Sequence, residues 1–249
     1  MNIKRQRLIK QVLISSLVLS GLVVTTTAAA SADSGAVVGN SVTAPLTKSP
    51  KLSATSSSGQ IGTMSYTYQD VVYKLGGGEV NKYISPWPWY QNPDVTGFVI
   101  TGDIELSNYA PSQMFYNLRN LTGFVGIEHI HTSEATNLSQ MFLNDSALVS
   151  LDLSSFRTEK VTQIYSLFQG DDALTTLRLA NFDTTKAPWV YDVFSSSALS
   201  NSKSCRKLSE MTISSRITAN FFNTLPDTGH QWVAVGNGTA KNPQGKTYT

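Results

Sequence analysis

The sequence has little that would crosslink or strongly charge the folded protein. Its 249 residues include one cysteine, Cys205, so no disulfide forms within the chain and the fold must be stable without one. Only 14% of the residues are charged, and the formal net charge is +2. Four of the 19 basic residues lie in the first ten positions, so the rest of the chain, with 17 acidic residues, is slightly acidic. The composition therefore argues against binding to nucleic acid.

The sequence also lacks the motifs of common catalytic sites. It contains no Gly-x-Ser-x-Gly, no His-Glu-x-x-His and no P-loop, since the glycines at 76–78 lack the lysine and helix start that a P-loop requires. No pair of carboxylates stands out for glycoside hydrolysis. We therefore expect a protein that is not an enzyme and uses no cofactor and no metal. A hydrolase acting on a polymer is the weaker alternative.

One apolar run lies near the N-terminus. Residues 12–24 follow the basic start and precede Ala30-Ser31-Ala32, a small-residue cleavage signal. The run is shorter than the roughly 20 residues of a membrane-spanning helix. We expect residues 1–32 to be a signal peptide. The mature chain is then either secreted or associated with the cell surface, and it does not insert into a membrane. An uncleaved N-terminal anchor is the alternative.

Composition divides the rest of the chain into segments. Residues 33–62 are rich in serine and threonine and contain no aromatic residue, which predicts a disordered linker. Residues 63–106 alternate apolar and polar side chains between glycine and proline turns, which predicts a β-rich N-terminal cap. We assign 107–222 to repeats and 223–249 to a C-terminal extension.

The repeat has a period of about 26 residues. An apolar residue followed by phenylalanine recurs four times, and seven apolar positions align in the three best units. The fourth unit is degenerate and contains a polar insertion with Cys205, as terminal repeats often do. The four pairs are Met114-Phe115, Met141-Phe142, Leu167-Phe168 and Val193-Phe194.

Each unit has the pattern of a leucine-rich repeat. Leu148, Leu151 and Leu153 have the spacing of a strand with one apolar face. Val161, Ile164, Tyr165 and Phe168 then follow at the spacing of one helix face. We predict an α/β solenoid with one strand and one short helix per repeat, stacked through right-handed crossovers.

The motif resembles the BspA-like leucine-rich repeat of Gram-positive bacterial surface proteins. The resemblance rests on the residues 141–162, on 179–185, on Pro86–Trp89 and on 232–245, and it covers about 66–245. It implies adhesion to host matrix or host cells, or contact between cells. The array is short, and the family's Gly-Cys-x-x-Leu reads Asn144-Asp145 and Gly170-Asp171 here.

Two groups of side chains are candidates for ligand contact. Four aromatic residues would form stacking surfaces if they are exposed, or pack beneath the cap if they are buried. Three aspartates precede successive strands and would line an acidic ledge for Ca²⁺ or a basic partner, or serve as turn residues. The candidates are Trp87, Trp89, Tyr90, Trp189, Asp145, Asp171 and Asp172.

Two further motifs have ordinary explanations. His129 and His131 have strand spacing and would form half of a metal site together with Glu128 or Glu134, but surface histidines are expected. Residues 225–229 match the sortase pattern Leu-Pro-x-Thr-Gly without an apolar segment after it, so we expect a turn there.

The sequence predicts a binding protein whose partner is a protein or glycan on a host or neighbouring cell. An extended contact surface is typical of solenoids, whereas a deep catalytic pocket is not. A truncated remnant of a larger wall-anchored adhesin is the alternative. Neither the ligand nor the oligomeric state follows from these residues.

Overall fold

The computed structural model describes residues 56–194, 204–226, 228, 232–233 and 247–248. Contacts divide the chain into two units, 1–54 and 55–249, and every described residue belongs to the second. The predicted signal peptide and most of the predicted linker therefore lie outside the described residues. Within the described part, no helix has the length and apolar character needed to cross a membrane.

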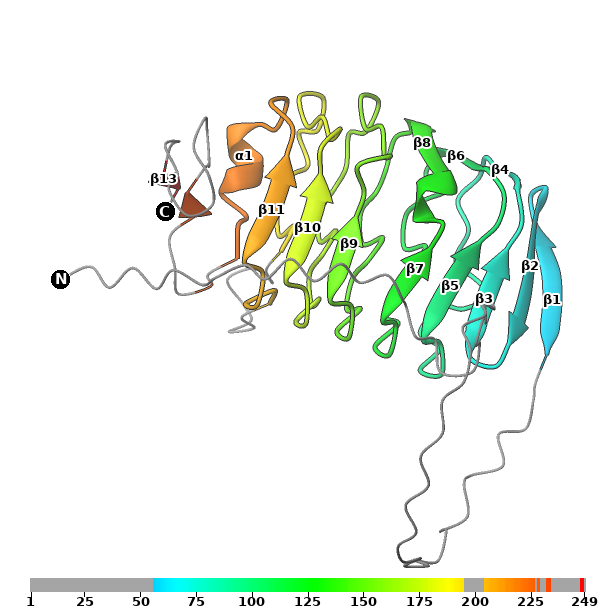
Figure 1. Ribbon diagram of the computed structural model, residues 1–249. Coiled ribbons are helices and arrows are strands. Elements are labelled where there is room, and N and C mark those ends of the chain that lie inside the picture. The colour runs from blue at the N-terminus through cyan, green and yellow to red at the C-terminus, as the bar shows by residue number, and fades with distance from the viewer. Residues whose placement is uncertain (1–55, 195–203, 227, 229–231, 234–246, 249) are drawn as a thin grey trace, which may run out of the picture. The chain divides into compact units, whose positions relative to one another are not determined.

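Parallel strands follow one another along one face of a stack of coils, as Figure 1 shows. The parallel strands form two groups of three. Within each group, the strand of one coil pairs in register with the strand of the next coil, so that Val72 pairs with Gly97 and Gly97 with Gly123. Leu151 pairs with Leu177 in the same way. The strands are β3 (Val72–Leu75), β5 (Gly97–Ile100), β7 (Gly123–Val125), β9 (Ser150–Asp152), β10 (Thr176–Leu179) and β11 (Glu210–Ile213).

A second parallel sheet forms where the chain turns away from the first. It contains β4 (Gly78–Val80), β6 (Ile104–Asn108) and β8 (Ile130–Ala135). The offset between coils is 26 residues where the Thr122 hydroxyl donates to the Thr96 carbonyl oxygen. The predicted repeat solenoid is thus confirmed.

The N-terminal end is closed by antiparallel strands. β1 (Ser57–Ile61) pairs with β2 (Met64–Gln69), and β2 pairs with β3, which begins the parallel stack. β1 lies inside the segment 33–62, so the prediction of a disordered linker is wrong for these five residues. The segment predicted as a separate cap, 63–106, also contributes β3 to β6 to the coils.

The C-terminal end carries a short helix. α1 (Ala219–Phe222) follows β11, and the chain turns just after it, where the Leu225 N–H donates to the Phe222 carbonyl oxygen. β12 (Trp232–Val233) and β13 (Thr247–Tyr248) pair in antiparallel fashion. Asp227 and Gly229 of the Leu-Pro-x-Thr-Gly motif lie outside the described residues.

The prediction of one helix per repeat is wrong. In the segment 158–169, where the apolar spacing favours a helix, the backbone N–H groups of Ile164, Ser166 and Phe168 donate to carbonyl oxygens of the next coil. These bonds replace the i to i−4 bonds of a helix. Apart from α1, the described helical structure is the 3₁₀ turn η1 (Ile127–His129). The apolar residues of this segment, such as Val161, Ile164 and Leu167, lie three positions apart and are all buried. This spacing is shared by one face of a helix and by the inward-facing positions of the bent coil, so it does not distinguish the two.

The recurrent phenylalanines form a spine through the core. Phe115, Phe142, Phe168 and Phe194 are fully buried and lie with ring centroids 5.4, 6.0 and 5.5 Å apart in succession. Phe221 of α1 closes the row with an edge-on contact to Phe194 at 5.5 Å. Stacked aromatic rings add to the hydrophobic gain from burial, so this spine explains why the Met-Phe pair recurs once per coil.

The extra residue between Phe124 and Ile127 is accommodated at Gly126. This glycine has a φ of 79°, in the left-handed region, and it directly precedes η1. A Cβ at this position would collide with the carbonyl oxygen of Ile100 in the previous coil. Glycine is therefore needed both for the backbone angle and for the close approach of two coils.

Replacing Gly126 by alanine is expected to lower the free energy of unfolding by about 2 kcal/mol or more. The new Cβ meets backbone, which cannot move aside without shifting the previous coil. Thermal unfolding followed by circular dichroism measures the change. The exposed neighbour Val125→Ala is the control and should melt close to the parent protein. An unchanged melting temperature for Gly126→Ala would contradict the described turn.

Candidate ligand-binding face

A third segment of each coil links the second sheet to the next strand of the first. Its backbone is bonded between coils: the N–H groups of Gln113, Phe115 and Asn117 donate to carbonyl oxygens one coil further on. Gln113, Gln140, Ser166 and Asp192 have φ values of 59°, 59°, 53° and 53° at the equivalent position of successive coils. These left-handed residues turn the chain so that the next residue enters the core while earlier side chains face outward.

Exposed aromatic side chains gather on this segment and beside it. Trp189 is 56% exposed, Tyr83 52%, and Tyr109 and Tyr191 46% each. The other large apolar side chains described as exposed are Val125 and Val149. Exposed tryptophan and tyrosine are enriched where proteins bind partners. We call this surface the tyrosine–amide face, made up of Tyr83, Tyr109, Gln113, Asn137, Gln140, Gln163, Tyr165, Trp189 and Tyr191.

Amide side chains on this face are linked to one another. Gln113 Nε2 donates to Gln140 Oε1 at 2.7 Å, and Gln113 Oε1 accepts from the Tyr83 hydroxyl at 3.1 Å. Asn137 Nδ2 donates to Gln163 Oε1 at 3.1 Å, and Gln163 Nε2 donates to the Tyr109 hydroxyl oxygen at 3.3 Å. The bonds between amides join successive coils, the bond from Gln163 to Tyr109 spans two coils, and together they fix the orientation of the amides.

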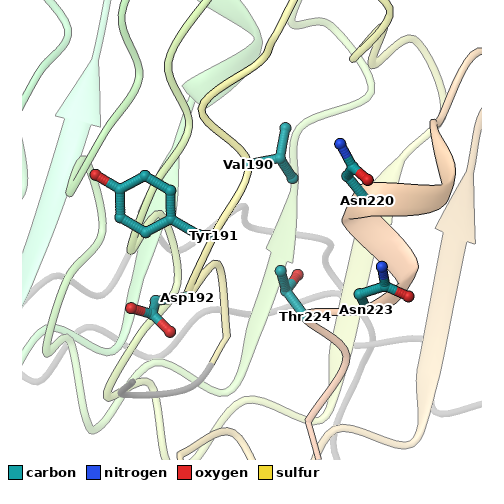
Figure 2. Close-up of a pocket in the computed structure, with 6 residues that line it drawn as sticks. All are labelled: Val190, Tyr191, Asp192, Asn220, Asn223 and Thr224. Carbon is teal, nitrogen blue, oxygen red and sulfur yellow. The ribbon is translucent and has the colours of Figure 1, made fainter. Parts of the chain in front are cut away.

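Two hollows lie along the face. The larger, of about 470 Å³, is lined by Tyr83, Tyr109, Tyr165, the amides of the face, Asn108 and Ser112. The smaller, of about 280 Å³, lies between Val190–Asp192 and the residues Asn220, Asn223 and Thr224 of and after α1, as Figure 2 shows. Tyr165 lines the first and Tyr191 the second, and their rings stack 5.3 Å apart at 6°. The stacked pair therefore connects the two hollows.

The face carries almost no charge. None of the residues that line the larger hollow is acidic or basic. Among the described residues, the smaller hollow contains one carboxyl group, Asp192, whose pKa is raised by partial burial. The surface therefore offers aromatic rings, amides and hydroxyls, with a single acid at one end.

The aromatic candidates from the sequence are divided between core and surface. Trp87 and Trp89 are buried, and their indole N–H groups donate to the carbonyl oxygens of Ser112 at 3.3 Å and Met114 at 2.5 Å. Neither ring is available to a ligand, which corrects the expectation that they form a stacking surface. Tyr90 is half-buried and stacks on Tyr116 at 4.9 Å, whereas Trp189 is exposed.

Two of the three candidate aspartates lie in the core, so the predicted acidic ledge is wrong for them. Asp145 Oδ1 accepts the Leu118 N–H and Asp171 Oδ1 accepts the Asp145 N–H, both at 2.8 Å, so the two carboxyls follow one another from coil to coil. The second oxygen of each has no hydrogen-bond partner. Burial raises the pKa of both carboxyls well above its ordinary range, and the charge of Asp145 raises the pKa of Asp171 further. Asp172 is exposed.

Cys205 occupies the position equivalent to Asp145 and Asp171 in the next coil. It precedes Leu208 as Asp171 precedes Leu174, and its thiol donates to the Phe168 carbonyl oxygen at 2.9 Å. The side chain is buried, and this burial raises the pKa of the thiol. Cys205 is therefore a core residue that substitutes for aspartate, with no accessible thiolate for chemistry.

The two histidines lie beside one carboxylate, that of Asp103. His129 Nδ1 lies 2.8 Å and His131 Nε2 3.3 Å from Asp103 Oδ1, and hydrogen bonds from His129 and then His131 lower the pKa of Asp103. Glu134 pairs instead with Lys160. No group of three potential ligands that would hold a metal ion is found in the described part of the chain.

Sequence reasoning missed most of the tyrosine–amide face. The sequence does contain a pattern that marks this face, just before the recurring apolar residue and phenylalanine. Gln113 and Gln140 lie one residue before this pair, and Tyr165 and Tyr191 lie two residues before it. Polar and aromatic residues that recur at a fixed place in a repeat, outside the core positions, mark an outward face. The repeat pattern does not predict Tyr83 and Tyr109, because they lie in irregular segments outside the repeated positions.

Comparisons with known proteins bear on the repeats. Searches of curated proteins and of solved structures gave no match. Residues 110–225, which include most of the tyrosine–amide face, match the family described as Mycoplasma protein of unknown function, DUF285.

Proposed function

We propose that this protein is an exported, non-enzymatic binding protein of the BspA-like leucine-rich-repeat kind, which mediates adhesion to host matrix, to host cells or between cells. Its ligand-binding surface is the tyrosine–amide face. The resemblance of the repeats to bacterial surface proteins and the signal-peptide pattern of residues 1–32 support the location. The observation that carries the proposal is the concentration of exposed aromatic side chains on one face of a regular solenoid.

The geometry of the two hollows favours binding over hydrolysis. Hydrolysis of a glycosidic bond ordinarily uses two carboxyl groups about 5–10 Å apart. Of the acidic residues that the structure describes, Asp192 lines the smaller hollow and none lines the larger. The buried carboxyls of Asp145 and Asp171 line neither hollow. A hydrolase therefore has less support than an adhesin.

Binding of the purified protein to immobilised fibronectin, collagen, mucin, epithelial cells and bacterial cell wall tests the proposal. We expect saturable binding to at least one of them, unchanged by a chelator, because the described residues contain no cluster of metal ligands. No product should be released from the bound polymer. Absence of binding to every surface, by protein shown to be folded, would contradict the adhesion proposal.

Variants on two faces of the molecule locate the binding surface. Trp189→Ala should weaken binding about tenfold, because a well-packed aromatic contact is worth more than 1 kcal/mol. The matched control is Val149→Ala, which removes an equally exposed apolar side chain elsewhere, at 51% against 56% exposure. Equal binding by the parent and both variants would place the ligand elsewhere on the protein.

A further inference from the structure

We infer that the tyrosine–amide face binds an uncharged polysaccharide chain that lies along the stack of coils. This inference rests on the proposed binding function and names the class of its ligand. Three properties of the face support it: the exposed aromatic rings, the fixed amides and the repeat of both along the stack.

The aromatic rings supply the apolar part of sugar recognition. One face of a sugar ring presents C–H groups, which pack against the electron-rich face of an aromatic ring. Tyr165 and Tyr191 stack at 6° between their planes, so their positions are fixed before a ligand arrives. Trp189 and Tyr109 add two further exposed rings.

The amides and hydroxyls supply the polar part. Gln140 Oε1 is occupied by Gln113, which leaves Gln140 Nε2 as a donor without a partner among the described residues. The Tyr109 hydroxyl accepts from Gln163 and retains its own proton for donation. Groups held in place by neighbouring hydrogen bonds lose little conformational entropy when they bind a ligand. Sugar hydroxyls both donate and accept hydrogen bonds, so they can accept from the Gln140 amide and the Tyr109 hydroxyl.

The repeat matches a polymer of regular units. Coils that pair through parallel strands lie about 4.8 Å apart, which is close to the length of one sugar unit in an extended chain. From Tyr83 to Tyr191 the face crosses several coils. Each coil therefore presents new amide or aromatic groups at about the interval at which a chain presents its next sugar. The neutral lining selects against a charged polymer, whose ionic groups would lose water without gaining a partner.

A peptide fits this face less well. A peptide strand adds to a sheet through unpaired backbone groups, but here the N–H groups of Gln113, Gln140 and Ser166 already donate to the next coil. Peptide side chains that dominate binding insert into well-packed pockets, whereas these two hollows are shallow. No charged group in the described part of the chain lines the larger hollow to pair with an ionic side chain.

Titration calorimetry of the purified protein with soluble neutral oligosaccharides tests the inference. The panel contains β-glucan, chitin, mannan and dextran fragments, each in a series of increasing chain length, with hyaluronan fragments and a tyrosine-rich peptide for comparison. We expect at least one neutral oligosaccharide to bind, and affinity to rise with chain length until the face is covered. Tyr165→Ala should weaken it about tenfold, and Gln140→Glu should do the same by adding a charge and removing the free donor.

Two controls keep a failure interpretable. Tyr165→Phe retains the stack on Tyr191 and should remain folded with a smaller loss, and Val125→Ala on another face should bind like the parent. If the protein binds none of the neutral oligosaccharides and binds cells or matrix equally well before and after their glycans are removed, adhesion stands and the glycan inference fails. If it binds only the peptide or only the charged polymer, the inference is likewise overturned. If it binds nothing at all, both proposals fail.

Discussion

Replacing Leu151 by aspartate is expected to unfold the whole coil stack. Leu151 is 3% exposed and pairs in register with Leu177 of the next coil, so the new carboxylate would be buried without a partner. Burying an unpaired charge in a core costs about 4–5 kcal/mol or more, which approaches the entire stability of a typical domain. The loss spreads because each coil is stabilised by its two neighbours.

Circular dichroism and thermal unfolding measure this effect. The matched control is Val149→Asp, two residues earlier in the same coil, which places the same carboxylate on a side chain that is 51% exposed. The control should melt close to the parent protein, whereas Leu151→Asp should show no cooperative transition. If both variants melted alike, Leu151 would not lie in a continuous core and the solenoid would be wrong.

Replacing both Asp145 and Asp171 by asparagine is expected to stabilise the protein at pH 8. Each asparagine retains an oxygen that accepts the N–H of Leu118 or of residue 145, and it removes a charge whose second oxygen has no partner. The amide nitrogen that replaces the unpaired oxygen also lacks a partner, so the gain comes from removing the buried charge and should be about 1–3 kcal/mol. Thermal unfolding at pH 8 measures it.

The pH dependence gives a second readout with a defined sign. Because the pKa of each carboxyl is raised in the folded state, the unfolded state releases protons more readily. The associated stability is fully present below the unfolded pKa of about 3.9 and is lost as the pH rises through the folded pKa. The parent should therefore become more stable between pH 8 and pH 5, and the double variant should lose much of this change.

The exposed neighbour provides the control for this experiment. Asp172→Asn removes a charge at the surface that contributes least to the raised pKa of Asp171, and it should change the pH profile much less than the double variant does. A double variant that is less stable than the parent at pH 8 by several kcal/mol would contradict the account of this column. It would mean that the two carboxylates are ionised and bound to a partner.

The core could be predicted from the sequence because buried positions carry apolar residues in every repeat. Leu148, Leu151, Leu153 and Phe156 are buried, as their alignment across units indicates. The helix was mispredicted because apolar spacing within one unit does not record whether N–H groups bond within the segment or to the next coil. Only the neighbouring coil supplies the acceptors for Ile164 and Phe168.

The candidate site could be predicted only in part. Trp87 and Trp189 are the same residue type, yet one is 2% exposed and the other 56%, and composition does not separate them. The buried Asp145 and Asp171 read as turn residues because carboxylates are rarely placed in a core. The sequence places Cys205 in an insertion because the repeat lengthens there. Residues bonded between successive coils are 26 positions apart at Asp145 and Asp171 but 34 apart at Gly170 and Ser204.

Hydroxyl-radical footprinting of the aromatic side chains tests most directly the claim that one face binds the ligand. The protein is oxidised alone and then with the neutral oligosaccharide that binds most tightly, and the labelled residues are identified by mass spectrometry. Tyr109, Tyr165, Trp189 and Tyr191 should be labelled in the free protein and protected in the complex, while the buried Trp89 stays unlabelled in both. Unchanged labelling of these four residues at saturating oligosaccharide would contradict the claim.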